Sequence, residues 1–398
     1  MIYLSIGSNL GNRFKNLRVA VSKLSDFFSL KKSSIVIETA AILPPAATCD
    51  WDLPYLNMIV AGKSTLDPFT FLNRIKNIEK EMGRDLSAPK WSPRIIDIDI
   101  IQYDNEKIDN EHLTIPHKEV KNRDFLQYLL KSVGCEFSEN FCFDDYRAIN
   151  YFVLDPKLVG IVNITPDSFS DGGKYFDHSA AINHINQLYC NGTCVIELGA
   201  QSTRPNYVEI SASEEISRID KILEQTKYMD CIGIDTYFDD VVKYVIKKYD
   251  LKWINDIKSQ LDVSTIKMIA DSGAKLVVML YGTDITWFRS RADYLQNLGI
   301  KKENIVLDPG VGFAKNKYEN IEIIRNISRI RDIGCEVMFA HSRKSFMSSF
   351  SNTVAADRDV ETIAISDYAA AQKMDYLRVH NIQNHMRFFV ARHFLESA

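Results

Sequence analysis

Eight short apolar runs in the second half of the chain constrain its fold most strongly. Each run is followed by a polar loop and an amphipathic stretch. The runs are Val159–Thr165, Cys194–Gly199, Cys231–Thr236, Lys252–Lys258, Lys275–Leu280, Asn304–Gly310, Cys335–Lys344 and Tyr376–Asn381. Near-continuous hydrophobic runs are typical of strands that are buried on both faces of a parallel sheet. Eight strand-then-helix units in about 245 residues predict an α/β barrel of the (β/α)8 TIM type, with an open doubly wound sheet as the alternative.

The first half of the chain shows a different order of elements. Its pattern predicts strands over 1–6, 34–42, 56–66 and 95–103, and helices over 13–28 and 67–83. Asp67 and Pro68 are a good N-cap and first-turn residue for the second helix. Strand pairs between helices predict an α+β sandwich of the ferredoxin-like type. We place the boundary near Asn150, which gives domains 1–150 and 151–398.

The composition excludes several classes of protein. With 398 residues, 46% hydrophobic and 25% charged, the chain suits two globular domains. A net charge of −4 gives no sign of a nucleic-acid or anionic-lipid partner. No apolar run approaches the roughly 18 residues of a membrane span, and the first residues already resemble a strand rather than a signal peptide. Seven cysteines without a CxxC pair favour reduced thiols, so we expect a cytoplasmic protein.

Two aspartates stand out in the apolar run 95–101. Asp97 and Asp99 are two residues apart, so in a strand both side chains point to the same side while the isoleucines face the core. Neighbouring carboxylates in such a run stay ionised only beside a compensating cation. Carboxylates together with phosphates are the usual ligands of Mg²⁺. The alternative is the exposed polar face of an edge strand.

The segments before and after this strand contain arginine and histidine side chains, which suit the polyanion of ATP. In the following motifs, the first half of the chain resembles the 6-hydroxymethyl-7,8-dihydropterin pyrophosphokinases. The matching stretches, in the order of that family, are Ile6-Gly7-Ser8-Asn9-Leu10, Tyr55-Leu56-Asn57, Gly83-Arg84, Trp91-Ser92-Pro93-Arg94, Asp97-Ile98-Asp99, Pro116-His117 and Lys121-Asn122-Arg123 with Phe125.

The resemblance implies roles for nine residues of the first domain. Asp97 and Asp99 would hold two Mg²⁺ ions on the triphosphate of ATP, and with Arg84 and Arg94 they would form the catalytic set. The residues that would contact ATP are Arg84, Arg94, His117 and Arg123. The residues that would hold the pterin are Tyr55, Asn57 and Phe125. Such a transfer needs alignment and charge neutralisation more than covalent help from the protein.

Polar side chains also stand at the C-terminal ends of the predicted barrel strands, where the active site of such barrels lies. The residues at these ends are Asn163, Thr203, Asp235, Asn255, Met279, Asp308, Lys344, Arg378 and His380, all of them polar except Met279. Each polar residue alone could be a cap or a turn residue. A barrel that served only as a scaffold would not need so many polar groups around one mouth, so the set predicts an active site.

The motifs around these positions resemble dihydropteroate synthase over residues 157–390. They are Val162–Gly173, Gln201–Pro205, Ile234–Thr236, Ile254–Ile257, Leu307–Phe313, Ser342–Ser345 and Arg378–His380. The resemblance implies that Asp235 and Lys344 are catalytic. The implied pterin-binding residues are Asp235, Asn255, Met279, Asp308, Phe313 and Lys344. The implied diphosphate-binding residues are Asn163, Thr203, Arg378 and His380, with one Mg²⁺ ordered by Asn163. The implied p-aminobenzoate-binding residues are Thr203, Arg204, Pro205 and Ser342.

The two resemblances together imply a bifunctional enzyme of folate biosynthesis. It would pyrophosphorylate 6-hydroxymethyl-7,8-dihydropterin with ATP, then condense the pterin diphosphate with p-aminobenzoate to dihydropteroate. Its partners would be these small molecules, with a homodimer through the barrel as a further possibility. The alternatives are a pterin-binding protein whose sites have decayed, and a corrinoid-linked methyltransferase. Both would have little use for carboxylates and cations that serve phosphate, such as Asp97 and Arg378.

Overall fold

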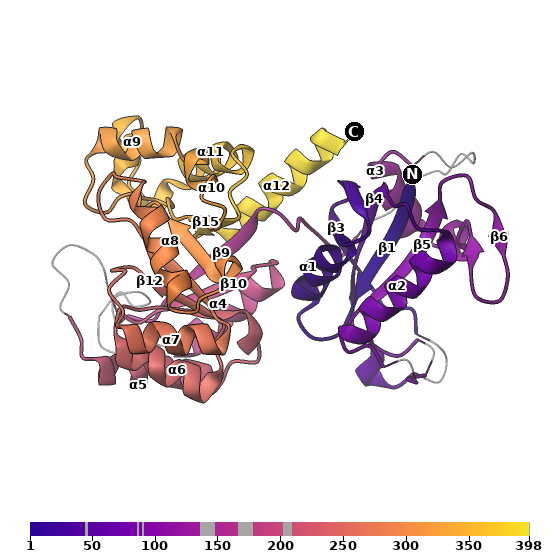
Figure 1. Ribbon diagram of the computed structural model, residues 1–398, viewed down its shortest axis with the longest axis horizontal. Helices are drawn as coiled ribbons and strands as arrows, with labels where there is room; N and C mark the ends of the chain where they lie inside the picture. The colour runs from indigo at the N-terminus through magenta and orange to yellow at the C-terminus, as the bar shows by residue number, and fades with distance from the viewer. Residues whose placement is uncertain are drawn as a thin grey trace. The chain divides into compact units, whose positions relative to one another are not determined.

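The computed structural model describes residues 1–43, 47–85, 87–89, 91–135, 148–165, 178–201 and 209–397. These residues form two compact units (Figure 1). The first unit comprises Met1–Leu154 together with the chain from Met386 onward, and the second comprises Asp155–His385. Among the described residues, none of the helices combines the length and apolar character that crossing a bilayer requires.

The first unit is an antiparallel sheet with helices against it. Its strands are β1 (Ile2–Ser8), β2 (Ser29–Ser33), β3 (Val36–Thr39), β4 (Tyr55–Lys63), β5 (Asp97–Tyr103) and β8 (Asn150–Phe152), and a separate hairpin joins β6 (Ile108–Asp109) to β7 (Thr114–Ile115). Its helices are α1 (Arg13–Leu24), α2 (Pro68–Glu81) and α3 (Asp124–Ser132), with 3-10 turns at Cys49–Trp51 and Lys118–Asn122. The order β5-β1-β4-β3-β8, with β1, β3, β4 and β5 linked as βαββαβ, is the ferredoxin-like arrangement. The predicted α+β fold is confirmed.

Local signals explain these elements. Alternate residues of β1, Ile2, Leu4 and Ile6, are fully buried, and α1 and α2 cover one face of the sheet (Figure 1). The Asp67 side chain caps α2 by accepting from the backbone N–H groups of Phe69 and Thr70, as predicted.

The strand predicted over 34–42 is shorter in the structure. The Ser34 side chain accepts from the Ile59 N–H at 2.8 Å and donates to the Ile35 carbonyl at 2.6 Å. These bonds to a side chain interrupt the backbone ladder, so β2 and β3 are separate strands on either side of Ser34.

The second unit is a closed barrel of eight parallel strands. They are β9 (Lys157–Asn163), β10 (Val195–Gly199), β11 (Ile232–Asp235), β12 (Trp253–Asp256), β13 (Lys275–Met279), β14 (Ile305–Asp308), β15 (Glu336–Phe339) and β16 (Tyr376–Val379). Each corresponds to one predicted apolar run. Because β16 pairs with β9, the sheet has no edge, and the alternative of an open sheet is wrong.

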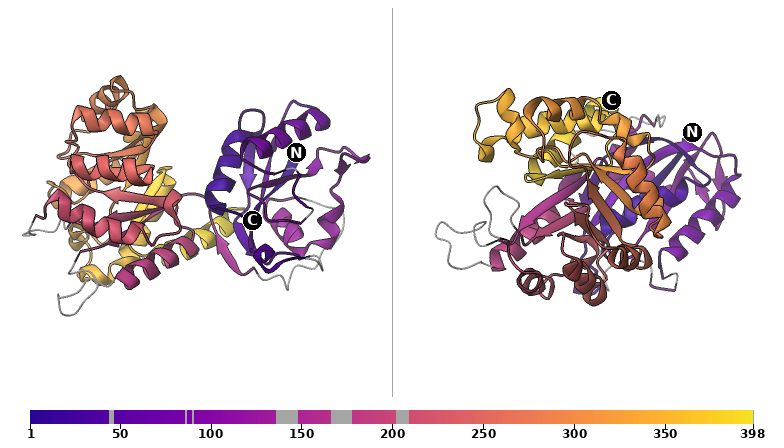
Figure 2. Two further views of the ribbon diagram at one scale, coloured as in Figure 1. Left: turned by 90° about the horizontal axis from the view of Figure 1, so that it is seen from below. Right: turned by 60° about the vertical axis from the view of Figure 1, so that its left-hand side comes forward.

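Helices surround the barrel strands (Figures 1 and 2). They are α4 (His178–Cys190), α5 (Ala212–Leu223), α6 (Asp239–Tyr249), α7 (Val263–Ser272), α8 (Trp287–Asn297), α9 (Lys317–Arg325), α10 (Ser328–Arg331) and α11 (Asp359–Ala371), with 3-10 turns at Met229–Cys231, Lys302–Asn304, Ser345–Ser349 and Ala355–Asp357. The last helix, α12 (Ile382–Ser397), begins in the second unit and belongs to the first unit from Met386 onward. The Ser211 side chain caps α5 by accepting from the Glu214 N–H, and α7 ends at Gly273 with φ +68°.

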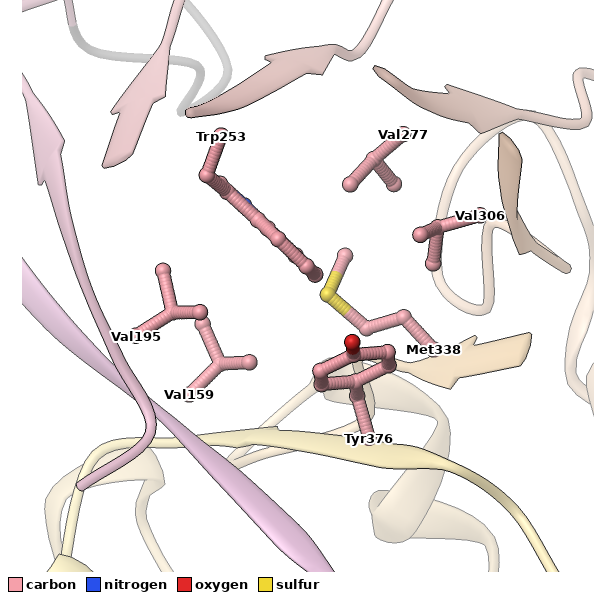
Figure 3. Close-up of a cluster of buried hydrophobic side chains, with 7 residues drawn as sticks. All are labelled: Val159, Val195, Trp253, Val277, Val306, Met338 and Tyr376. Carbon is pink, nitrogen blue, oxygen red and sulfur yellow. The ribbon is translucent and has the colours of Figure 1, made fainter. Parts of the chain in front are cut away.

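A layer of apolar side chains fills the barrel interior (Figure 3). Its members are Val159, Val195, Trp253, Val277, Val306, Met338 and Tyr376. The Trp253 and Tyr376 rings meet edge to face, 4.9 Å apart. The Trp253 indole lies directly over Gly233, where a Cβ would come within 2.3 Å of the indole Cδ1. The layer therefore depends on a residue without a side chain at position 233.

Candidate active sites

A cavity of about 370 Å³ lies in the first unit, beside β1, β4 and β5. All nine residues that the sequence predicted for this site line it. They are Tyr55, Asn57, Arg84, Arg94, Asp97, Asp99, His117, Arg123 and Phe125. Gly7 of β1 also lines it, and a Cβ there would approach the Asn57 amide oxygen to 3.0 Å. The Asn57 side chain is held by donation to the Thr39 hydroxyl at 2.9 Å.

Strand β5 presents its two aspartates to this cavity. Ile98 and Ile100 are buried, whereas Asp97 and Asp99 are partly exposed and line the cavity. The two carboxylates therefore lie on the same side of the strand, as the spacing predicts.

The two aspartates differ in their surroundings. Asp97 accepts from Arg84 Nη1 at 2.6 Å and from Arg94 Nη1 at 3.1 Å. Burial acts to raise the pKa of Asp97, but the charges of Arg94 and Arg84 bring it below its usual range. For Asp99, burial and the negative charge of Asp97 raise the pKa to about 7. Such an electron-rich pair, with one carboxylate short of compensating charge, fits a divalent cation.

A third carboxylate, Glu79 of α2, was not predicted from the sequence. Its side chain is fully buried and accepts from Arg84 Nη1 at 2.6 Å, from Lys76 Nζ at 2.9 Å and from the Ile98 N–H at 2.8 Å. Glu79 thereby fixes Arg84 next to Asp97 and ties α2 to β5. The one signal in the sequence is an acidic residue on the apolar face of the helix.

His117 and Arg123 lie at the other side of the cavity. Burial, followed by the charge of Arg123, lowers the pKa of His117, so this imidazole is neutral near pH 7. Its Nδ1 accepts from the Glu119 N–H at 3.3 Å. Arg123 Nε is buried and, within the described part of the chain, has no hydrogen-bond partner; Glu119 Oε2 lies 3.6 Å away.

In the barrel, a second layer of side chains lies two residues beyond the apolar layer of Figure 3. Because residues two apart on a strand share a side, this second layer also faces the interior, nearer the C-terminal ends of the strands. Its members include Glu197, Asn255, Met279, Asp308 and Arg378, which follow Val195, Trp253, Val277, Val306 and Tyr376. Three predicted pterin-binding residues, Asn255, Met279 and Asp308, therefore lie directly above the apolar core layer of the barrel.

Arg378 connects two carboxylates in this layer. Its Nη2 donates to Asp235 at 2.8 Å, and its Nε donates to Glu197. Burial raises the pKa of Asp235 to about 7, against the opposing charge of Arg378. Arg378 is therefore a neighbour of the predicted pterin residue Asp235 as well as a predicted diphosphate ligand.

Glu197 of β10 was not predicted from the sequence. It is fully buried, and its Oε2 accepts from Trp253 Nε1 at 3.1 Å and from Asn255 Nδ2 at 3.2 Å. The Asn255 Oδ1 is buried and has no hydrogen-bond partner among the described residues. The available signal was a single carboxylate inside an otherwise apolar strand.

Lys344 and Asp308 form the opposite side of the mouth. Burial lowers the pKa of Lys344 to about 8, although the charge of Asp308 acts in the other direction. The Lys344 ammonium donates to the Val311 carbonyl and lies 4.4 Å from the centre of the Phe313 ring. Burial likewise raises the pKa of Asp308, which accepts from the Gly310 N–H at 2.8 Å.

Ser342 and His380 meet at the ends of β15 and β16. His380 Nδ1 lies 2.9 Å from the Ser342 hydroxyl. Burial and the charge of Arg378 lower the pKa of His380 to about 4, so His380 is neutral at pH 7 and offers hydrogen bonds rather than charge. Asn163 stands at the end of β9. The predicted residues Thr203, Arg204 and Pro205 lie outside the described residues.

Known proteins match both units. Residues 3–134 match the family model of 7,8-dihydro-6-hydroxymethylpterin-pyrophosphokinase, and residues 159–380 match that of pterin binding enzymes. A folate synthesis bifunctional protein of Chlamydia caviae is 32% identical, covering 98% of this chain and 97% of the relative. One of Arabidopsis thaliana is 28% identical, covering 97% and 94%.

A solved structure agrees with the barrel. The dihydropteroate synthase of Anaplasma phagocytophilum, with bound 6-hydroxymethylpterin-monophosphate, is 33% identical over 61% of this chain and 97% of its own, with a TM-score of 0.53. Full-length similarity at this level, together with matches to both family models, leaves no place for a methyltransferase. The chain belongs to the family of bifunctional folate synthesis enzymes, which join a hydroxymethyldihydropterin pyrophosphokinase to a dihydropteroate synthase.

Proposed function

We propose that the residues assembled in the two sites carry out the two activities of this family in sequence. The cavity of the first unit transfers a diphosphoryl group from ATP to 6-hydroxymethyl-7,8-dihydropterin, and the barrel joins the product to p-aminobenzoate. The observation that carries the proposal is the meeting of two carboxylates and several cationic groups in one cavity.

One coupled assay tests the proposal. The purified chain, ATP, Mg²⁺, hydroxymethyldihydropterin and p-aminobenzoate should yield dihydropteroate. Omission of ATP should stop the reaction, and pre-made pterin diphosphate should restore it. Failure of pre-made pterin diphosphate to react would contradict the barrel assignment alone, whereas failure to form it would contradict the kinase assignment.

In the kinase site, Asp97 and Asp99 would hold two Mg²⁺ ions. Among the described residues, no group of three or more His, Cys, Asp and Glu side chains could hold a metal. Two carboxylates are nevertheless enough for Mg²⁺, which takes its other ligands from phosphate and water. When bound, Mg²⁺ would neutralise charge on the triphosphate. Arg84 and Arg94 would turn from Asp97 toward the transferred diphosphoryl group.

The remaining residues of this cavity would position the two substrates. His117 and Arg123 would contact ATP, and Arg123 Nε, which has no hydrogen-bond partner among the residues that the structure describes, would be one available donor. Tyr55 and Phe125 would stack on the pterin, and Asn57 would bind its edge. Alignment of the pterin hydroxyl with the β-phosphorus replaces the entropy of a bimolecular encounter.

In the barrel, the mouth would hold a pterin edge-on. Asp235, Asn255 and Asp308 offer acceptors to the N–H groups of the pterin, and the ammonium of Lys344 offers a donor. The Asn255 Oδ1, which finds no hydrogen-bond partner in the described part of the chain, supports this assignment, because a buried acceptor without a partner is costly until a ligand supplies one. Met279 and Phe313 would supply apolar walls.

The leaving diphosphate would lie toward the ends of β9 and β16. Arg378, His380, Asn163 and Thr203 would bind it, with one Mg²⁺ near Asn163. Loss of diphosphate leaves a cationic pterin methylene, which the Asp235 carboxylate would stabilise electrostatically. The amine of p-aminobenzoate would attack this carbon from a site formed by Thr203, Arg204, Pro205 and Ser342.

A homodimer through the barrel is part of the proposal. Phe350, Val354 and Val360 are 57%, 64% and 77% exposed; the first two precede α11 and the third lies in its first turn. Exposed apolar side chains are candidates for an association surface. Sedimentation velocity should show a dimer, and Val360→Glu should shift it to monomer.

We also propose that residues 1–150 carry the kinase activity and residues 151–398 the condensation activity. A cytoplasmic location is a further proposal. A fragment that starts near Tyr151 should condense pre-made pterin diphosphate with p-aminobenzoate. The first compact unit includes the chain from Met386, where His393 Nε2 lies 2.9 Å from the Ser33 carbonyl. A fragment 1–150 lacks this contact, so it should unfold at a lower temperature than the same unit in the full chain.

A further inference from the structure

We propose that Glu197 is a positioning residue that fixes the orientation of the Asn255 amide and holds Arg378 in the barrel mouth. The inference rests on the proposed pterin and diphosphate sites of the barrel. Nothing in the sequence motifs or in the assigned reaction gives Glu197 a role. Its position in the structure does.

Glu197 receives donors from two other strands of the barrel. Trp253 Nε1 and Asn255 Nδ2 of β12 both donate to its Oε2, at 3.1 and 3.2 Å, and Arg378 Nε of β16 donates to its Oε1. The carboxylate is fully buried within β10, where its neighbours Ile196 and Leu198 are also buried. Because the carboxylate is buried, these three hydrogen bonds orient the four side chains relative to one another.

The chemistry of the carboxylate decides which way the Asn255 amide faces. A side-chain amide has a donor end and an acceptor end of nearly equal size. Glu197 forms an ion pair with Arg378, and a carboxylate in an ion pair only accepts hydrogen bonds, so the amide turns its Nδ2 toward Glu197. Oδ1 is then the free end, and it is the buried atom without a partner among the described residues.

Glu197 itself is held by the core layer. The Trp253 indole packs on Gly233 and against the Tyr376 ring. This packing directs the indole Nε1 of Trp253 toward Glu197. The packed layer of Figure 3 therefore fixes the position of the Glu197 carboxylate, and the carboxylate fixes the orientation of the Asn255 amide. A pterin meets an acceptor at this position that needs no reorganisation, which favours an N–H of the ligand over a carbonyl.

Arg378 is shared between Glu197 and Asp235, so Glu197 also limits how far Arg378 can move. With Glu197 as its second partner, the guanidinium keeps its place when Asp235 turns to the pterin. Removal of the Glu197 charge should leave Arg378 closer to Asp235 alone and less available to a diphosphate.

The test is Glu197→Gln in the full chain. Glutamine has one acceptor oxygen and an amide donor, so it cannot accept from Trp253, Asn255 and Arg378 together. We expect calorimetric binding of 6-hydroxymethylpterin to weaken about tenfold, or about 1.4 kcal/mol, and condensation of pre-made pterin diphosphate to fall at least as much. The pyrophosphokinase rate of the same polypeptide should not change.

Glu336→Gln is the matched control. Glu336 of β15 accepts from Lys157 Nζ at 2.8 Å, from Lys275 and from the Tyr376 hydroxyl at 3.0 Å, at the opposite ends of the strands from the proposed site. This variant should lower the melting temperature and leave pterin affinity unchanged. If it weakens pterin binding as much as Glu197→Gln does, the effect is general loss of packing and the inference is wrong.

A double-mutant cycle separates positioning from a general structural role. In an Asn255→Ala background, Glu197→Gln should cost less than about threefold in pterin affinity, because the residue through which it acts is gone. Glu197→Asp keeps an acceptor-only group and should bind pterin better than Glu197→Gln, which provides a second variant if the glutamine form is unstable. An undiminished loss in the Asn255→Ala background overturns the inference, as does glutamine binding as well as aspartate. A wild-type chain that fails to condense pterin diphosphate would instead overturn the proposed function.

Discussion

The barrel reaction should have a pH profile that is set by two buried groups with displaced pKa values. Lys344 faces Asp308, Arg378, Lys315 and Asp235, and burial lowers its pKa to about 8. The proposed mechanism needs the ammonium of Lys344 and the carboxylate of Asp235, whose pKa burial raises to about 7. The reaction should therefore be fastest between pH 7 and 8.

The signs and sizes of the two limbs follow directly. Below pH 7 the Asp235 carboxylate takes up a proton, so kcat/KM should fall about tenfold for each further unit of acidification. Above pH 8 the Lys344 ammonium loses its proton, so kcat/KM should fall about tenfold by pH 9. Because kcat/KM reports the free enzyme, the pKa values of the unliganded structure are the relevant ones.

The measurement is kcat/KM for pre-made pterin diphosphate from pH 5.5 to 9.5, at saturating p-aminobenzoate and constant ionic strength. Lys344→Arg is the decisive variant, because a guanidinium stays charged throughout and should abolish the alkaline fall while the acid limb remains. Ionisation of the substrate affects both enzymes equally. Burial also lowers the pKa of Lys315 to about 8, and this lysine is still present in the variant. If Lys315 caused the alkaline fall, the fall would therefore remain in Lys344→Arg. An alkaline limb that persists in Lys344→Arg would refute the assignment.

Three further results are expected. Asp97→Ala should abolish pyrophosphoryl transfer and leave condensation intact, with both reactions assayed on one preparation; near wild-type kinase activity at millimolar Mg²⁺ would contradict the metal assignment. Arg378→Ala should lower kcat/KM for pterin diphosphate about 30- to 1000-fold, or roughly 2–4 kcal/mol, in steady-state assays. Gly233→Ala should destabilise the barrel by about 1–3 kcal/mol in urea unfolding, because its Cβ would overlap Trp253. An unchanged unfolding midpoint would show that the indole moves aside at little cost.

Most of the fold was predictable because its signals are local. Each barrel strand is a run that is apolar on both faces, and closure needs only eight such runs with helices between them. The capping residues Asp67 and Ser211 and the terminal Gly273 act within a few positions of their helices. The strand β2 before Ser34 was missed, because the separation of β2 and β3 depends on the Ser34 hydroxyl, which accepts from the Ile59 N–H on a strand 25 residues away.

In the sites too, residues with a local signal were predictable, and residues whose partners are distant in sequence were missed. Asp97 and Asp99 were predictable from their spacing in one strand, and the strand-end residues of the barrel from the architecture. Glu197 and Glu79 were missed because their partners are distant in sequence: Glu197 meets Arg378, 181 positions away, and Glu79 meets Ile98 on another element. The sequence also suggested that Arg378 serves diphosphate apart from the pterin residues, whereas the structure pairs it with Asp235.

In the proposed kinase site, the pairing of Asp97 with Arg84 and Arg94 would link the binding of a phosphate to the binding of a cation. A phosphate that takes either arginine removes compensating charge from Asp97, and the exposed carboxylate then repels the phosphate. A cation that takes Asp97 releases the arginines, and their charge then repels the cation. Under the proposed assignment, each ligand alone would meet an opposing charge, and each would remove that cost for the other. The affinity for each would then rise by the same factor when the other is bound. The proposed site therefore predicts positive heterotropic cooperativity between nucleotide and divalent cation, carried by these three side chains.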